Sequence, residues 1–282
     1  MSEAGAAALA AAAAARVTLV IGANDTGKST LITRLAGALA GRRRAVGIVD
    51  ADLGQSDVGP PTTVGLGRVR GPIDHLADAE LLGLEFLGVT SPALCLRETA
   101  EATARQVRRA LDAGCEHVLV DTSGLVEGRF GLALKRLKIE RVAPDLLVVL
   151  QRADECEPIL RALAASARPR IVRVPAVRTT RRSATVRRQA RQRSLAAYLA
   201  GAVGVTLDLR RVAARPAPAG RGLAVIELEG ALVGLDGRDG RTLGLGWVSA
   251  VDMPKAWLTV ETIVDGQRIT ALAVGRERYR TA

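Results

Sequence analysis

The sequence predicts an α/β protein, with a parallel sheet flanked by helices and a small antiparallel β module at the C-terminal end. Two observations support this fold class. Up to about residue 174, short apolar segments that end in Gly or Asp alternate with segments of helical periodicity, which is typical of a parallel sheet. Beyond about residue 203, short apolar runs are instead separated by Asp-Gly pairs, which favour hairpin turns.

The composition sets limits on the class of protein. The 282 residues suit one large domain or two small ones, and a hydrophobic content of 48% is sufficient for a core. A net charge of +11 favours an anionic partner such as nucleic acid. Cys95, Cys115 and Cys156 follow neither a disulfide nor a metal spacing, which favours the cytoplasm. No apolar run is long enough to span a membrane, and the Ala-rich N-terminal segment lacks the basic start of a signal peptide.

The first predicted strand, residues 17–21, leads into the sequence G-x-x-x-x-G-K-[ST] and then into a predicted helix at residues 31–39. This arrangement is the phosphate-binding loop of P-loop NTPases. The glycines allow the backbone to approach phosphates, Lys28 is expected to reach the β and γ phosphates, and Ser29 is expected to hold magnesium. The predicted nucleotide-binding residues are Gly22, Ala23, Asn24, Asp25, Thr26, Gly27, Lys28, Ser29 and Thr30.

Acidic residues follow two further predicted strands. Asp50 and Asp52 come after a strand at residues 45–49, and Asp121 ends a strand at residues 117–121 in the manner of a Walker B segment. Loops at the carboxyl ends of parallel strands line the ligand crevice, so these carboxylates are candidates to meet magnesium, a water or an incoming hydroxyl. For Asp50 and Asp52 a solvated acidic turn is the alternative.

The remaining elements of the α/β part are predicted from periodicity. Strands are expected at residues 84–89, 145–150 and 170–174. One helix is expected at residues 96–111, where Gly114 would end it, and another around residues 135–138. The segment 151–154 shares only its Asp with a guanine-recognition motif, and Asp154 and Glu155 are better interpreted as the start of a helix.

No acidic residue occurs between Glu157 and Asp208, whereas arginine is frequent there. Residues 187–199 are predicted to form a helix. Its arginines could stabilise a transferring phosphoryl group, hold a nucleic-acid backbone, or simply form a solvated basic face. The arginines of this span are Arg161, Arg168, Arg170, Arg173, Arg178, Arg181, Arg182, Arg187, Arg188, Arg191 and Arg193.

The C-terminal module shows no catalytic constellation and is expected to bind, buttress or mediate contacts. Residues 215–220 are predicted to be a linker, and strands are expected at 223–228, 231–235, 243–251, 256–264 and 268–274. Hairpin turns are expected at Asp236-Gly237, Asp239-Gly240 and Asp265-Gly266.

Four segments together resemble the P-loop polynucleotide 5′-hydroxyl kinases, which include the RNA kinase subunit of the mRNA cleavage factor and the kinase of pre-rRNA processing. Residues 22–30 resemble the family's G-P-x-D-x-G-K-S-T loop, with Ala23 in place of Pro, and residues 50–55 resemble its D-x-D-x-G-Q segment. Residues 122–124 resemble its T-x-G-W clasp, although Leu125 stands where the family has Trp. The arginine-rich run that ends at Gly201 resembles its lid.

The resemblance implies an ATP- and magnesium-dependent kinase that transfers the γ-phosphate to the 5′-hydroxyl of RNA or DNA. It implies that Lys28 and Ser29 grip the triphosphate and magnesium, and that Asp52 activates the hydroxyl with support from Asp50. The acceptor end would be held by Gln55, Thr122, Ser123 and Gly124, and the lid arginines Arg188, Arg191 and Arg193 would stabilise developing charge. The expected metal ligands are Ser29, Asp50, Asp52 and Asp121.

The same resemblance suggests a division of the chain into an Ala-rich helix or tail at residues 1–15, a kinase domain with an arginine-rich lid at 16–202, and a β-rich module at 203–282. Two other functions fit the residues. One is a regulatory P-loop ATPase or GTPase without a nucleic-acid substrate, and the other is a nucleotide-gated RNA-binding scaffold without enzymatic activity.

Overall fold

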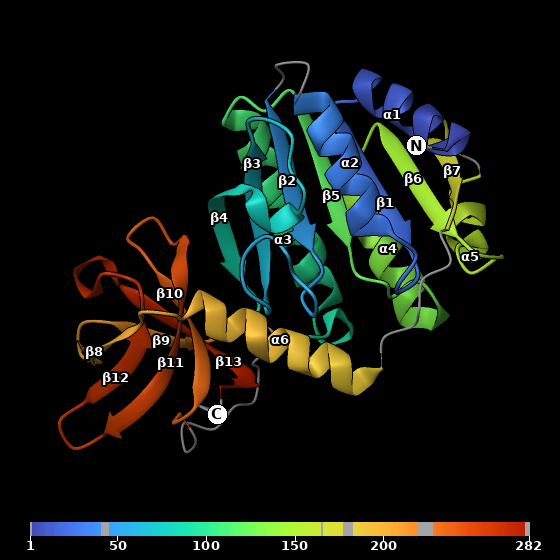
Figure 1. The fold of residues 1–282 in the computed structure, drawn as a ribbon. Helices are drawn as coiled ribbons and strands as arrows, with labels where there is room; N and C mark the ends of the chain where they lie inside the picture. Colours follow the sequence, from blue (N-terminus) through green and yellow to red (C-terminus); the bar gives the residue numbers. More distant parts are fainter. Residues whose placement is uncertain (1, 41–44, 165, 177–182, 219–227, 280–282) are drawn as a thin grey trace.

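The structure, a computed structural model, describes residues 2–40, 45–164, 166–176, 183–218 and 228–279. Five parallel strands in the order β7-β6-β1-β5-β2 form the centre of its first part (Figure 1). Their bounds are Val17–Gly22 for β1, Val46–Ala51 for β2, His117–Thr122 for β5, Leu146–Gln151 for β6 and Arg170–Pro175 for β7. The predicted fold class is therefore confirmed.

Two antiparallel strands, β3 (Thr63–Val69) and β4 (Glu80–Phe86), extend this sheet beyond β2. Strand β3 was not predicted from the sequence, and β4 begins four residues earlier than predicted. Strand β3 is hard to recognise because two glycines interrupt its apolar pattern. Gly65 has a packing reason, because a Cβ atom there would lie 1.8 Å from the carbonyl oxygen of Val58, which passes over the strand.

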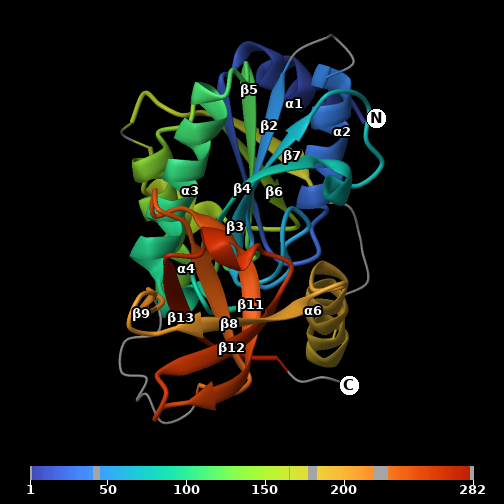
Figure 2. The ribbon, with the colours of Figure 1, turned by 90° about the vertical axis from the view of Figure 1, so that its left-hand side faces the viewer.

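Helices cover both faces of the sheet, as the view along it shows (Figure 2). Helices α1 (Glu3–Ala14) and α2 (Lys28–Ala40) lie on one face, and α3 (Leu96–Asp112), α4 (Gly128–Val142) and α5 (Glu157–Arg161) lie on the other. The N-terminal segment is a helix rather than a tail. Alanine has the highest helix propensity, the Ser2 hydroxyl accepts a hydrogen bond from the Gly5 amide at 3.2 Å, and Ala8 and Ala12 are fully buried.

The C-terminal module is built from β8 (Val203–Asp208), β9 (Ala213–Pro216), β10 (Ala231–Asp236), β11 (Thr242–Asp252), β12 (Trp257–Thr262) and β13 (Ala271–Arg278). Strands β10 and β11 form a hairpin across the two Asp-Gly pairs at residues 236–240, as predicted. Strand β9 pairs in parallel with β13, so residues 213–216 are an edge strand rather than part of a linker. An edge position tolerates Pro216, which has no amide hydrogen to donate.

The prediction of a hairpin at Asp265-Gly266 is wrong. Strand β12 pairs with β11 and β8, whereas β13 pairs with β10 and β9, so the two strands that flank this turn are not partners. The Asp265 carboxylate instead accepts a hydrogen bond from the Gln267 amide and caps a 3-10 turn at Gly266–Arg268. The strand predicted at residues 223–228 falls almost entirely outside the described residues.

One sheet continues through both parts of the molecule, because Thr242 of β11 is paired with Leu84 of β4. Helix α6 (Ala184–Tyr198) crosses the carboxyl ends of the parallel strands and reaches this junction (Figure 1). Its Leu195 side chain is buried against Leu84 and Phe86 of β4 and against side chains of the C-terminal module. The helix begins at Ser183, whose hydroxyl accepts a hydrogen bond from the Val186 amide at 3.2 Å.

Candidate active site at the carboxyl ends of the strands

The P-loop connects β1 to α2 with the expected geometry. Gly27 has φ +89°, and a Cβ atom on Gly22 would lie 2.3 Å from the carbonyl oxygen of Leu150, so both positions require glycine. The Lys28 ammonium donates a hydrogen bond to the Ala23 carbonyl at 2.8 Å, and the Thr26 hydroxyl donates to the same oxygen at 2.9 Å. The loop therefore folds around the position at which a P-loop holds phosphates, with a buried cation on it.

Ser29 and Asp121 bring two oxygen atoms together beside the P-loop. The Ser29 hydroxyl donates a hydrogen bond of 2.6 Å to Asp121, which lies at the end of β5 and is nearly fully buried. Burial raises the pKa of Asp121, although Lys28 and the Ser29 hydrogen bond act in the opposite direction. In the part of the chain that the structure describes, no three His, Cys, Asp or Glu side chains converge on a metal position. This arrangement fits magnesium, which typically takes one or two carboxylates and completes its shell with phosphates and water.

Asp50 and Asp52 have different positions, although they are two residues apart. Asp50 is buried and accepts hydrogen bonds from the amides of Asp52, Asp57 and Val58 at 3.0, 2.6 and 3.1 Å, so it holds the loop after β2 in place. Burial and the nearby Asp121 raise its pKa well above the ordinary value. Asp50 does not line the main cavity, in contrast to its expected role as a metal ligand. Asp52 does line it.

The segment predicted to clasp the acceptor lies on the P-loop. A Cβ atom on Gly124 would lie 2.0 Å from the Asn24 carboxamide oxygen, so glycine is required for this close approach. Thr122 is fully buried, and its hydroxyl donates to the Val20 carbonyl at 2.8 Å, which makes it a support rather than a surface residue. Ser123 and Leu125 line a cavity, and the buried Ser123 hydroxyl has no hydrogen-bond partner among the described residues.

Two fully buried lysines of α4 support these loops, although only their helix was predicted from the sequence. The Lys135 ammonium donates to the Thr122 hydroxyl at 2.9 Å and to the Ser123 carbonyl at 2.6 Å. The Lys138 ammonium donates to the carbonyl of Ala51, between Asp50 and Asp52, at 3.1 Å. Burial lowers the pKa of Lys135 well below its ordinary value and that of Lys138 to about 8. The sequence does not indicate that these lysines are buried. They are three residues apart on one face of a helix, and exposed lysines often have the same spacing.

The arginines of α6 separate onto different sides of the helix. Arg191 lines the main cavity, and Arg187 makes an ion pair of 3.8 Å with Asp25 of the P-loop. Arg188 lines a second cavity, to which Arg191 also contributes, and Arg193 lines neither of these two cavities. At 100° per residue, Arg193 points about 200° away from Arg191. The earlier arginines Arg178, Arg181 and Arg182 lie outside the described residues.

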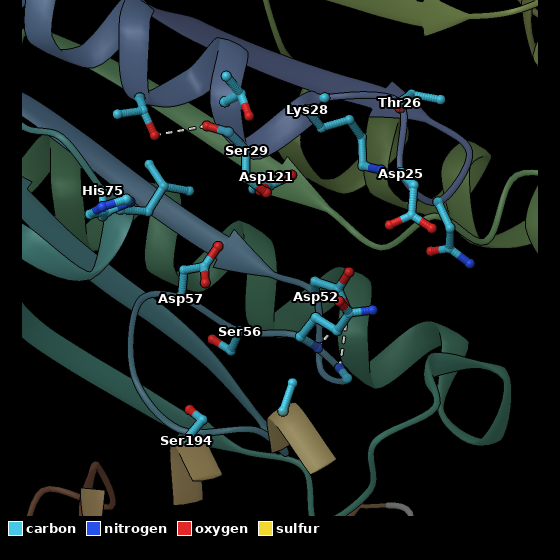
Figure 3. Close-up of a pocket in the computed structure, with 18 of the residues that line it drawn as sticks. Asp25, Thr26, Lys28, Ser29, Asp52, Ser56, Asp57, His75, Asp121 and Ser194 are labelled. Atoms are coloured by element: carbon cyan, nitrogen blue, oxygen red, sulfur yellow. Dashed lines mark hydrogen bonds between the residues drawn. The ribbon is translucent and has the colours of Figure 1, made fainter. Parts of the chain in front are cut away.

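The main cavity has a volume of about 850 Å³ and joins these groups. In Figure 3, Lys28, Ser29 and Asp121 lie on one side of it, and Asp52, Ser56 and Asp57 lie on the opposite side. An adjoining cavity of about 490 Å³, here called the acceptor cavity, is lined by the segment 123–127, Asp52, Gln55 and Arg191. The main cavity also includes His75 and Ser194, which no sequence pattern had indicated. Asp52, Gln55 and Arg191 thus lie where the two cavities meet.

The segment 151–154 contacts the P-loop through Arg152. The Arg152 guanidinium donates to the backbone carbonyls of Asn24 and Asp25 and so fixes the outer side of the P-loop. Helix α5 begins at Glu157, later than predicted, because the Glu155 carboxylate accepts from the amides of Arg152 and Ala153 and closes a turn before the helix.

The fold and this site define a P-loop protein, with the Walker lysine, a serine–aspartate pair and a further carboxylate around one cavity. Residues 22–201 match the family model described as the mRNA cleavage and polyadenylation factor CLP1 P-loop. The chain belongs to this family, which confirms the resemblance in the sequence.

Several curated relatives carry the name polyribonucleotide 5′-hydroxyl-kinase. That of Pyrococcus furiosus is 34% identical over 197 residues, which cover 69% of this chain and 53% of the relative. That of Thermococcus kodakarensis is 38% identical over 145 residues, which cover 51% of this chain and 40% of the relative. The chain therefore spans about half the length of these relatives or less.

Solved structures support the fold. The Clp1p chain of a wild-type Clp1p–Pcf11p complex superposes with a TM-score of 0.72 over 93% of this chain and 74% of that one, at 15% sequence identity. A second Clp1p–Pcf11p structure gives a TM-score of 0.71 at 16% identity. No helix in the described residues has the length and apolar character needed to cross a bilayer.

Proposed function

We propose that this protein is an ATP- and magnesium-dependent polynucleotide 5′-hydroxyl kinase, which transfers the γ-phosphate of ATP to the 5′-hydroxyl end of RNA or DNA. The observation that carries the proposal is the position of Asp52 and Gln55 on the boundary between the main cavity and the acceptor cavity. A phosphoryl donor and a hydroxyl acceptor must meet at such a boundary. The names of the archaeal relatives support the same reaction.

In this proposal, residues of both cavities have roles in the transfer of the phosphoryl group. The P-loop amides and Lys28 hold the triphosphate, and Lys28 balances charge on the γ-phosphate. Ser29 and Asp121 would hold magnesium, which supplies further charge neutralisation when bound. Asp52 accepts the proton of the attacking hydroxyl. Its carboxylate is held in place for this role, because the amides of Gly54 and Gln55 donate hydrogen bonds to its Oδ1 atom at 3.0 and 3.1 Å.

The acceptor end is held on the other side of this boundary. Ser123 and Gln55 offer hydrogen-bonding groups to the terminal sugar, and Gly124 keeps the clasp against the P-loop. Arg191 balances the charge that develops on the transferring group. In this proposal residues 16–202 form the kinase unit, residues 203–282 buttress α6, and α1 covers the sheet. A cytoplasmic setting is proposed because Cys95, Cys115 and Cys156 are buried free thiols.

A transfer assay tests the proposal. The protein, magnesium and γ-labelled ATP are mixed with matched RNA and DNA oligonucleotides that carry a 5′-hydroxyl, with 5′-phosphorylated strands as the control. Label is expected only on the 5′-hydroxyl strands. Lys28→Ala is expected to abolish transfer, and Asp52→Asn is expected to abolish transfer while ATP binding persists. Label released only as free phosphate would contradict the kinase and favour a regulatory NTPase.

A further inference from the structure

A further cavity of about 620 Å³ lies between α6, the C-terminal module and the loops that follow β2 and β4. We call it the junction cavity. Helix α6 contributes Arg188 and Arg191 to its lining, and β13 contributes Glu277 and Arg278. Helix α6 runs between the two parts of the molecule at this place (Figure 1).

The junction cavity adjoins the site of the proposed reaction. Arg191 lines the main cavity, the acceptor cavity and the junction cavity, so the three meet at this side chain. Thr90 lines both the acceptor cavity and the junction cavity. Its position is fixed from the C-terminal module, because the Glu277 carboxylate accepts hydrogen bonds from the Thr90 amide at 3.1 Å and from its hydroxyl at 2.8 Å.

The lining of the junction cavity suits a chain of phosphodiesters. Among the described residues that line it are three arginines and one carboxylate, Glu277, which already accepts the two hydrogen bonds from Thr90. Arginine binds phosphate oxygens with a planar fork of donors. Arg278 is oriented by a hydrogen bond of 2.6 Å to the Glu229 carbonyl. Leu195 and Leu232 add an apolar surface on which a sugar can pack.

No aromatic side chain is among the described residues that line the junction cavity. Stacking of bases on aromatic rings is the usual means by which proteins grip single-stranded bases, so this lining favours the backbone over the bases. A ligand held here would bind with little dependence on sequence and with a strong dependence on salt.

We propose that the junction cavity binds the sugar–phosphate backbone of the acceptor strand beyond its first two nucleotides. The strand would enter the acceptor cavity with its 5′-hydroxyl near Asp52, pass Thr90 and Arg191, and lie against Arg188 and Arg278. This inference rests on the proposed kinase function. It makes the C-terminal module a part of the substrate-binding surface instead of only a buttress.

The test compares a dinucleotide with a decanucleotide as acceptor, both with a 5′-hydroxyl. Arg278→Gln is expected to raise the KM for the decanucleotide roughly three- to tenfold and to leave kcat and the dinucleotide KM unchanged. The slope of log KM against log salt for the decanucleotide is expected to fall by about 0.7. The matched control is Arg108→Gln, which removes the same charge from an exposed position on α3 and is expected to change neither KM.

Gln192→Glu serves as an independent second variant, because Gln192 is an exposed residue of α6 that lines the junction cavity. Its added negative charge is expected to raise the decanucleotide KM in the same way. Equal dinucleotide-to-decanucleotide KM ratios in the unsubstituted protein and both variants would overturn the position of the strand while leaving the kinase intact. If the unsubstituted protein transfers phosphate to neither acceptor, the proposed function falls and this inference falls with it.

Discussion

At the scale of single residues, the buried lysines of α4 are the least expected feature of the site. A buried ammonium loses its hydration, and hydrogen bonds from Lys135 and Lys138 to loop oxygens offset only part of that cost. The two lysines lie beneath the segments that carry Asp52 and Ser123, and their hydrogen bonds to backbone carbonyls and to the Thr122 hydroxyl hold these segments in place. We interpret both lysines as positioning residues. Their burial lowers the stability of the fold, and their hydrogen bonds keep the loops of the site ordered.

This interpretation predicts how stability changes with pH. The pKa of Lys138 is lowered from 10.5 to about 8, mainly by burial and against the attraction of Asp52, Asp50 and Asp121. Between pH 8 and pH 10.5 the lysine is protonated in the unfolded chain and mostly deprotonated in the native state. The contribution of Lys138 to the free energy of unfolding therefore rises with pH, by about 3 kcal/mol across this range. Below pH 8 the lysine is charged in both states and its burial cost is constant.

The measurement is the free energy of unfolding in denaturant for the unsubstituted protein and for Lys138→Met across that range of pH. The difference between the two proteins removes the contributions of other groups, such as the buried cysteines, that titrate in the same range. The unsubstituted protein is expected to gain stability relative to Lys138→Met as the pH rises. Parallel curves would mean that Lys138 does not change its ionisation there.

At the scale of elements, α6 connects the P-loop to the C-terminal module. Arg187 forms an ion pair with Asp25 near one end of the helix, and Leu195 is buried at the module junction near the other. The Tyr198 hydroxyl accepts a hydrogen bond of 3.3 Å from the Leu245 amide. A helix anchored at both ends can hold Arg191 at the meeting point of the cavities, where it would act on a transferring phosphoryl group.

Because Arg191 and Arg193 lie on opposite sides of α6, we expect their substitution to have unequal effects on activity. Arg191→Gln is expected to lower kcat/KM for transfer roughly a hundredfold, because it removes a cation from the reaction cavity. Arg193→Gln, with the same change in charge on the opposite side, is expected to change it by no more than about twofold. Steady-state kinetics on one oligonucleotide provide the comparison. Equal losses in the two variants would show that the helix contributes only a general positive field.

Elements with a regular pattern could be predicted from the sequence, and those that depend on tertiary contacts could not. The strands β1, β5 and β6 are continuous apolar runs because both of their faces are buried, and α3 has one clear apolar stripe. Strand β9 was missed because it contains a proline and gains its partner from β13, more than fifty residues later. Strand β8 was missed because only its pairing with β12 makes it a strand.

The residues of the candidate site also differ in how far local sequence predicts their positions. Residues in a dense local motif, such as those of the P-loop, were predictable because the backbone itself forms the site. The separate positions of Asp50 and Asp52 depend on the fold of the loop after β2, and the sides of α6 depend on how that helix docks. His75 reaches the main cavity from the β3–β4 connection, and a single histidine carries no pattern from which its position could be inferred.

At the scale of the whole molecule, the two parts are joined so closely that their relative position is fixed by backbone contacts. The Arg276 amide donates to the Gly88 carbonyl at 2.9 Å, next to the point where β4 ends. Gly88 has φ +76°, and a Cβ atom there would lie 2.7 Å from the Cα atom of Gly275 and 2.8 Å from the side chain of Ala217. The junction cavity and the docking of α6 both depend on this contact.

Gly88→Ala tests how much the junction contributes to stability. Two costs are expected: about 1–2 kcal/mol for an alanine at positive φ, and about 1–3 kcal/mol more for the crowding against Gly275 and Ala217. Gly114→Ala is the matched control, because Gly114 has φ +82° but, apart from its chain neighbours, no described residue has an atom within 4 Å of the added methyl group, so it carries only the first cost. Urea unfolding of both variants measures the difference. If Gly88→Ala loses no more stability than Gly114→Ala, the two parts separate at this contact without cost, and the C-terminal module cannot hold α6 rigidly over the site.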